Sequence, residues 1–286
     1  MHNTSRDRSW FAVRSIAVIA VTSAALLAAG SCERPADDRP DRGPSRDWPS
    51  DRPGAKLVVA READDKPVRA PWGGLQVAER GNGERAVVML HGYGSRGDDF
   101  VDFATGIVEE VPALYVIPSG PLTSSTGEGR AWFEPALSSQ RGEEDRREAA
   151  HDVGASRARL EGVVETLFGR GVGRDAGVVA GFSQGGTVAS DLAICGENPI
   201  HAVAVFSGAH LPRCNARRRI EGMRWFVSHG DRDHIIPAAD ADRVVAELER
   251  QGAVVEYVRF DGGHEIPPEV LRRFVDWLAS TFAELK

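Results

Sequence analysis

The chain has 286 residues, of which 42% are hydrophobic and 27% are charged, and its formal net charge at pH 7 is −7. This composition is ordinary for a globular protein, and the length allows one large domain or two small ones. The acidic balance, with no basic patch, excludes nucleic acid as an expected partner. The three cysteines, Cys32, Cys195 and Cys214, have a spacing that matches no zinc or redox pattern.

The N-terminus has the pattern of a targeting segment. Three arginines precede a short apolar run at residues 15–30, which is too short to span a bilayer comfortably. The run ends in Ala-Ala-Gly-Ser-Cys32, which resembles the lipobox of bacterial lipoproteins, where small residues precede a cysteine that is lipidated. We therefore expect residues 1–31 to be a signal peptide and Cys32 to carry a lipid anchor outside the cytoplasm. Cleavage to a secreted or periplasmic protein and a retained anchor are the alternatives.

Residues 32–55 are rich in Pro, Asp, Arg and Ser, with a single large apolar residue, Trp48. Such a segment cannot bury a core, so we expect a disordered tether that holds the folded part away from the membrane. The remaining segment, 56–286, has the size of one α/β domain. No internal repeat is visible in it.

Apolar runs that predict strands alternate along this segment with amphipathic stretches that predict helices. This order predicts a largely parallel sheet covered by helices on both faces, with ligands bound at the carboxyl ends of the strands. The expected strands are 75–79, 86–90, 113–117, 177–180, 202–206, 224–228 and 253–260, and the expected helices are 98–110, one containing 160–167, one beginning near 186, 240–251 and 267–282.

The pentapeptide Gly-Phe-Ser183-Gln-Gly stands between an expected strand and an expected helix. Strand, G-x-S-x-G and helix in this order form the nucleophile elbow of an α/β-hydrolase. The serine sits on a sharp, strained turn, so the residues two positions away on each side must be small. The motif alone is common by chance, so its weight depends on the loops that follow the other strands.

The loop after the strand 86–90 is His91-Gly-Tyr93-Gly-Ser. In this fold the loop supplies one N–H of the oxyanion hole, and the residue after the nucleophile supplies the other. We expect these donors to be the N–H groups of Tyr93 and Gln184. His91 is expected to hold the loop together by hydrogen bonds and not to act as a base.

Two further loops offer an acid and a base. Asp233 follows the strand 224–228, with Asp231 as the alternative acid, and His264 lies on a Gly-rich loop after the last strand. The chain order Ser183, Asp233, His264 is that of α/β-hydrolases, which predicts a serine hydrolase that needs no cofactor. The stretch His-x-Asp-x-Asp-His faintly resembles the metal motif of the metallo-β-lactamase fold. That motif requires a histidine where Asp231 stands, so no metal is expected.

The segments HGYGS, GFSQGG, FSG, HGDRDHIIP and GGHEIPPEV together resemble the phospholipase/carboxylesterase family of α/β-hydrolases, which includes acyl-protein thioesterases. The resemblance covers residues 75–285. It implies an α/β-hydrolase fold with a mostly parallel central sheet, helices on both faces and little or no lid. It also implies hydrolysis of short- to medium-chain carboxylic esters, with a small-molecule or lipid-like ester as substrate.

The resemblance also assigns roles to residues. It implies Ser183 as nucleophile, Asp233 as acid, His264 as base, and the N–H groups of Tyr93 and Gln184 as the oxyanion hole.

The segment from Arg130 to Phe133 is similar to the family's R-x-W-F segment near the acyl pocket, which implies that Trp132 and Phe133 contact substrate. The family usually has Asp where Glu134 stands here.

Three matters remain open in the sequence. A peptidase or a polyester- or polysaccharide-ester hydrolase would share the triad, and a tethered binding module without activity is the alternative from another class. The oligomeric state is not indicated. A disulfide between Cys195 and Cys214 is chemically allowed outside the cytoplasm. We nevertheless expect these cysteines to be too far apart, because a strand of five residues, about 17 Å long, separates the two ends at which they should lie.

Overall fold

The computed structural model describes residues 68–125, 127, 129–134, 143–208, 214 and 218–285. The expected signal peptide, Cys32 and the expected tether lie outside the described residues, so the segment boundaries at 31 and 55 stay predictions. None of the described helices is long and apolar enough to cross a membrane.

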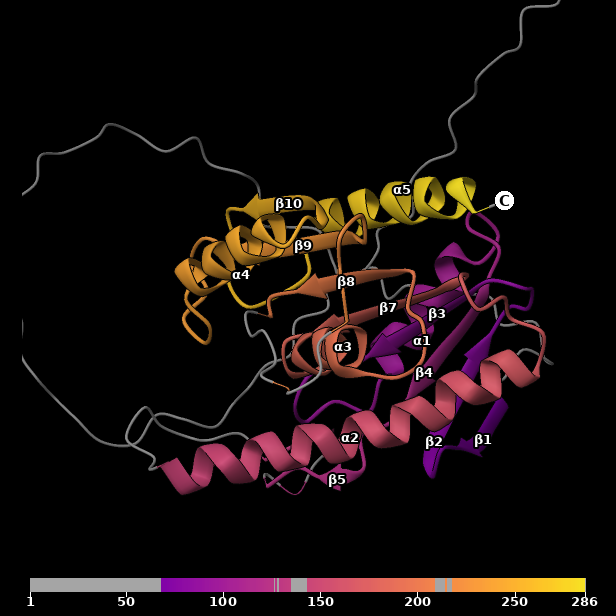
Figure 1. Cartoon of the computed structure of the whole chain (residues 1–286), viewed down its shortest axis with the longest axis horizontal. Coiled ribbons are helices and arrows are strands. Elements are labelled where there is room, and N and C mark those ends of the chain that lie inside the picture. Colours follow the sequence, from indigo (N-terminus) through magenta and orange to yellow (C-terminus); the bar gives the residue numbers. More distant parts are fainter. Residues whose placement is uncertain are drawn as a thin grey trace, which may run out of the picture. The chain divides into compact units, whose positions relative to one another are not determined.

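An eight-stranded sheet forms the centre of the described structure (Figure 1). The first two pairings, β1 with β2 and β2 with β4, are antiparallel, and all the others are parallel, which confirms the expected mostly parallel sheet. In spatial order the strands are β1 (Val68–Trp72), β2 (Leu75–Arg80), β4 (Leu114–Pro118), β3 (Ala86–Leu90), β7 (Gly177–Phe182), β8 (Ala202–Phe206), β9 (Arg224–Gly230) and β10 (Val254–Phe260).

Helices cover both faces of the sheet, as the sequence predicted. Successive side chains of a strand point to opposite faces, so Val87 and Met89 of β3 join one apolar core while Val88 and Leu90 join the other. The first core is closed by α1 (Asp98–Ile107) and α5 (Pro268–Glu284), and the second by α2 (Glu143–Gly169), α3 (Gln184–Cys195) and α4 (Ala238–Arg250) (Figure 1).

The sequence missed three strands, β1 and the two strands of a short hairpin. The strand β1 pairs with β2 through a turn at Gly73 and Gly74, whose φ angles of 58° and 78° favour glycine. A short hairpin of β5 (Leu122–Thr123) and β6 (Arg130–Ala131) lies in a stretch for which the sequence predicted no strand.

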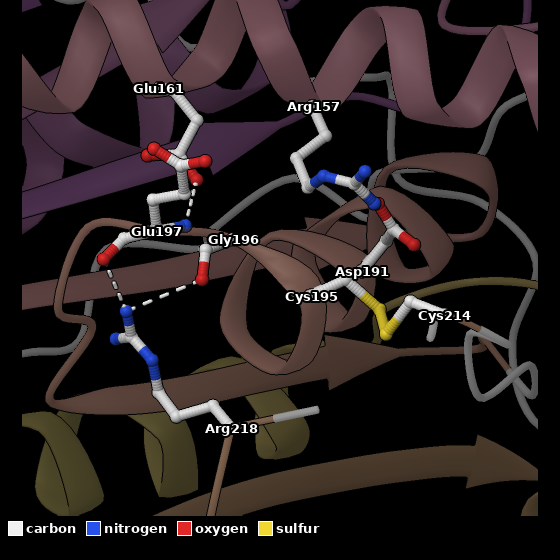
Figure 2. Close-up of a disulfide and its surroundings, with 8 residues drawn as sticks. All are labelled: Arg157, Glu161, Asp191, Cys195, Gly196, Glu197, Cys214 and Arg218. Atoms are coloured by element: carbon white, nitrogen blue, oxygen red, sulfur yellow. Dashed lines mark hydrogen bonds and ion pairs between the residues drawn. A yellow bond between two sulfur atoms is a disulfide. The ribbon is translucent and has the colours of Figure 1, made fainter. Parts of the chain in front are cut away.

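A disulfide joins Cys195, the last residue of α3, to Cys214, so the expectation that these cysteines lie apart is wrong (Figure 2). The Cα atoms are 6.0 Å apart. The distance estimate failed because the chain returns from the far end of β8 to the end of α3. The returning chain is held there by Arg218, whose N–H donates to the Ile194 carbonyl at 2.8 Å. Its guanidinium also donates to the carbonyl of Glu197 at 2.6 Å.

The same end of α3 is attached to α2 (Figure 2). Glu161 of α2 accepts hydrogen bonds from the N–H groups of Glu197 at 2.7 Å and Asn198 at 3.1 Å. One turn earlier, Arg157 of α2 pairs with the buried Asp191 of α3 at 2.5 Å. The helix that follows the elbow is therefore fixed at its C-terminal end by a covalent bond and by charged hydrogen bonds.

Candidate active site

Ser183 lies between β7 and α3 with φ 53° and ψ −114°, a strained conformation for a residue other than glycine. The flanking glycines explain how the turn closes. A Cβ at Gly181 would lie 2.3 Å from the backbone of Gly185, and a Cβ at Gly185 would lie 2.1 Å from the Leu90 carbonyl oxygen. The turn therefore needs glycine at both places, which is the steric reason that the sequence motif implied.

The structure brings Ser183, His264 and Asp233 into one chain of hydrogen bonds. His264 Nδ1 lies 2.7 Å from Asp233 Oδ2, and His264 Nε2 lies 2.8 Å from Ser183 Oγ. Because a carboxylate only accepts, Nδ1 carries the imidazole proton. Nε2 is then free to accept the proton of the serine hydroxyl.

Asp233 is buried, and its second oxygen is held by the backbone. Oδ1 accepts hydrogen bonds from the N–H groups of Ile235 at 2.8 Å and Ile236 at 2.9 Å. Burial by itself would raise the pKa of the Asp233 carboxyl, but hydrogen bonds from His229, His264 and Ile236 outweigh it and hold this pKa well below its usual range. Asp233 is therefore ionised at neutral pH and able to orient an imidazole.

Asp231, the alternative acid, lies elsewhere. Its carboxylate is 45% exposed and pairs with Arg259 of β10 at 2.5 Å. Of the two candidates, the structure therefore places only Asp233 at His264.

The loop after β3 lies beside the serine, since a Cβ at Gly92 would be 3.6 Å from the Ser183 Cβ. The N–H groups of Tyr93 and Gln184 find no acceptor among the described residues. Gln184 is the first residue of α3, where the helix dipole places partial positive charge. Two amides available as donors beside the serine hydroxyl suit an anionic oxygen.

Backbone hydrogen bonds hold this loop against the β5–β6 hairpin. Gly94 N–H donates to the Arg130 carbonyl, and Arg130 N–H donates to the Ser95 carbonyl, each at 2.9 Å. At the hairpin the Tyr93 hydroxyl lies 2.6 Å from Ser125 Oγ. The loop that bears the Tyr93 amide is thus held against the hairpin by backbone and side-chain contacts.

His91 holds the loop after β3 in place by hydrogen bonds to the backbone. Gly120 N–H donates to its Nε2 at 2.9 Å, so Nδ1 carries the proton and donates to the Gly92 carbonyl at 2.7 Å. Burial lowers the pKa of His91 to about 4. Both ring nitrogens are used for hydrogen bonds to the backbone, which agrees with the structural role expected from the sequence.

Trp132 and Phe133 do not have the same surroundings. The Trp132 side chain is 0% exposed, and its indole N–H donates to the His91 carbonyl at 2.9 Å. It therefore supports the loop from inside the protein, which differs from the expected contact with substrate. Phe133 is partly exposed and remains the better candidate for that contact.

The sequence missed two side chains of this region. Gln184 accepts a hydrogen bond from the Trp132 N–H at 2.8 Å and donates to the Phe133 carbonyl at 2.5 Å, so it links the elbow to that segment. His229, at the end of β9, lies 3.2 Å from Asp233. The sequence showed it only as the first residue of the HGDRDHIIP segment, directly after the expected strand 224–228, and that place gave no indication of a contact with Asp233. Among the described residues, no group of His, Cys, Asp and Glu side chains could hold a metal ion.

Solved structures of esterases have the same fold. Esterase PE8 matches with a TM-score of 0.61 and 22% identity, covering 75% of this chain and 98% of its own. A carboxylesterase from Mesorhizobium loti matches with a TM-score of 0.60 and 21% identity, covering 72% and 94%. The Bacillus cereus carboxylesterase matches with a TM-score of 0.61 and 19% identity, covering 73% and 95%. At such identities the likeness shows the fold alone.

Among curated proteins the chain has no match. The sequence model of the Phospholipase/Carboxylesterase family matches residues 75–282, which is most of the chain. The chain therefore belongs to the phospholipase/carboxylesterase family, and it is a carboxylic ester hydrolase.

Proposed function

We propose that the protein is a serine carboxylesterase that hydrolyses short- to medium-chain carboxylic esters through an acyl-enzyme intermediate. The observation that supports it most strongly is the chain of hydrogen bonds from Ser183 through His264 to the ionised Asp233. The range of acyl chains rests on family membership.

In the proposed mechanism, His264 Nε2 removes the Ser183 proton while Oγ attacks the ester carbonyl carbon. Asp233 holds the imidazole by its Nδ1 proton and stabilises the imidazolium that forms. The N–H groups of Tyr93 and Gln184 donate to the tetrahedral oxyanion, and each such donor contributes about 3 kcal/mol to the lowering of the barrier.

The imidazolium of His264 then protonates the leaving alcohol, and the acyl group stays on Ser183 Oγ. A water molecule, deprotonated by His264, attacks the acyl carbonyl through a second tetrahedral state on the same donors. Collapse of that state returns the proton to Ser183 and releases the carboxylic acid.

Ser183→Ala tests the proposal. It should abolish hydrolysis of p-nitrophenyl esters and labelling by a fluorophosphonate, and leave the melting temperature nearly unchanged. Ser190→Ala, which removes a hydroxyl from α3 away from the site, is the matched control and should keep both activities. A series of acyl lengths on the same alcohol then tests the proposed chain range. Ester hydrolysis that survives in the Ser183 variant would refute the assignment.

We also propose that the enzyme is held outside the cytoplasm by a lipid on Cys32, with 1–31 as signal peptide and 32–55 as tether. The lipobox-like N-terminus supports this location. The Cys195–Cys214 disulfide supports it independently, because disulfides persist in oxidising compartments.

Expression of the whole chain in a bacterium, followed by detergent phase partition, tests the anchor. The wild-type protein should enter the detergent phase and incorporate radiolabelled palmitate, and the Cys32→Ser variant should incorporate none. An unlabelled wild-type protein in the aqueous phase would contradict the anchor and favour the secreted or periplasmic alternative.

A further inference from the structure

A second histidine contacts the carboxylate of Asp233, and the proposed mechanism leaves it without a role. His229, the second-to-last residue of the strand β9, is completely buried. Its Nε2 lies 3.2 Å from Asp233 Oδ2, which is the same oxygen that binds His264 Nδ1. A buried imidazole against a buried carboxylate is a costly arrangement unless hydrogen bonds compensate for the lost water.

The hydrogen-bond partners of His229 fix its protonation. Nε2 is also 2.9 Å from the Ile236 carbonyl oxygen, so both of its neighbours are acceptors and Nε2 must carry the proton. Nδ1 is buried and finds no partner among the described residues. All polar contacts of this side chain are therefore made by the Nε2–H group, which points towards the loop that carries Asp233.

These contacts close a small ring around the acid. Ile236 N–H donates to Asp233 Oδ1, and the Ile236 carbonyl accepts from His229, which also reaches Oδ2. The loop that carries the carboxylate is thereby joined to His229 of β9 through Oδ2 and the Ile236 carbonyl, while Oδ1 is held within the loop by the Ile236 N–H. Rotation of the carboxylate away from His264 would break these contacts together.

We infer that His229 is a positioning residue for the proposed hydrolysis. Its single Nε2–H is shared between the Ile236 carbonyl, at 2.9 Å, and the oxygen of Asp233 that binds His264, at 3.2 Å, and so sets both the direction and the hydrogen-bonding strength of the carboxylate. The inference rests on the proposed triad and adds a fourth member that contacts neither substrate nor the reacting atoms.

The charged groups around Asp233 determine the direction in which the pH dependence of the rate should shift when His229 is replaced. The titratable groups that act on the Asp233 carboxyl are His229 from β9 and His264 from the loop after β10, and Asp242 of α4 is the other carboxylate that His229 influences. A carboxylate that loses one donor binds its remaining donor more tightly. Without the His229 donor, the imidazolium of His264 is favoured to higher pH, and its readiness to pass the proton onward falls.

A matched pair of variants tests the inference. In His229→Gln the amide nitrogen stands at the same number of bonds from Cβ as Nε2 and keeps the donor. In His229→Asn it stands one bond closer, where Nδ1 was, and cannot reach Oδ2. Both are neutral amides on the same strand. Ser228→Ala, at the preceding buried position, whose hydroxyl has no partner among the described residues, controls for disturbance of the strand.

We expect His229→Asn to lower kcat by about 10- to 100-fold, the range for loss of a hydrogen bond to a charged group, with KM little changed. The acid limb of its kcat/KM profile should move up by roughly half a pH unit or more. His229→Gln should have a kcat close to that of the wild-type protein and the wild-type acid limb of the kcat/KM profile. Ser228→Ala should leave both quantities unchanged. If the Asn variant does not fold, the Gln variant is judged alone. Wild-type kcat and acid limb in this variant support the inference, and a loss of kcat of about 10-fold or more with the limb unmoved overturns it.

Two results would overturn the inference. One is an Asn variant with wild-type kcat and acid limb, and the other is a Gln variant as impaired as Asn with the limb unmoved, which would mean a merely structural histidine. Failure of the proposed function looks different, because then the wild-type protein lacks esterase activity or Ser183→Ala keeps it.

Discussion

Removal of the Cys195–Cys214 disulfide should destabilise the enzyme substantially while leaving its catalytic constants almost unchanged. The bond closes a loop with a sequence separation of 19. The chain-entropy relation for a loop of this length gives a loss of about 11 cal/mol/K from the unfolded ensemble, or about 3 kcal/mol of stability at room temperature. For a domain of this size the melting temperature should fall by roughly 6–12 °C.

The assay is urea unfolding of the wild-type protein and of a Cys195→Ala/Cys214→Ala double variant, each with and without a thiol reductant. Reductant should lower the unfolding midpoint of the wild-type protein towards that of the variant and leave the variant where it is. Rates on a p-nitrophenyl ester should stay close to wild type, because the bond lies at the end of α3 opposite to Ser183.

Oxidised protein whose unfolding midpoint does not respond to reductant would contradict a stabilising role of the bond. A variant that loses activity without losing stability would contradict it as well, since the bond would then act on the site and not on the unfolded chain.

Two further predictions follow from single positions. Gly185→Ala, in the first turn of α3, should abolish activity and lower the melting temperature, because its Cβ would lie 2.1 Å from the Leu90 carbonyl oxygen. Gly177→Ala, at the start of β7, has no atom within 4 Å of the added Cβ and should be tolerated. Equal effects of the two substitutions in thermal melts would contradict the steric argument. Burial lowers the pKa of His91 from 6.5 to about 4, so in this pH window the unfolded chain binds a proton that the folded chain does not, and stability should decrease on acidification by up to about 3 kcal/mol. Urea unfolding across that window should show a weaker pH dependence in His91→Gln, and an unchanged slope would exclude His91 as its source.

The sequence predicted the parallel part of the sheet well because each of its strands is a buried apolar run. The bounds of β3 and β8 agree with expectation to the residue. The strand β1 was missed because it contains Pro71, and proline argues against a strand. It pairs with β2, the next strand along the chain. The Gly73-Gly74 turn was the signal that could have shown the hairpin.

In the site, too, some features could be predicted from the sequence and others could not. The order of Ser183, Asp233 and His264 depends on which loop follows which strand, and a sequence shows that order directly. The role of His229 depends on which buried atom a side chain meets, and no spacing encodes it. Trp132 was placed by likeness to a family segment, which indicates nearness to the site but not which surface of the ring is covered.

The covalent link at the end of α3 has one further consequence. The bond between Cys195 and Cys214 encloses the whole of β8, the strand beside the elbow, in a closed loop of chain. A protease that cut the chain once inside this loop would leave the two pieces joined, so the nicked enzyme would migrate as one band until a reductant was added. In an oxidising compartment, where we propose that the enzyme resides, such a bond limits the damage that a single cleavage can do.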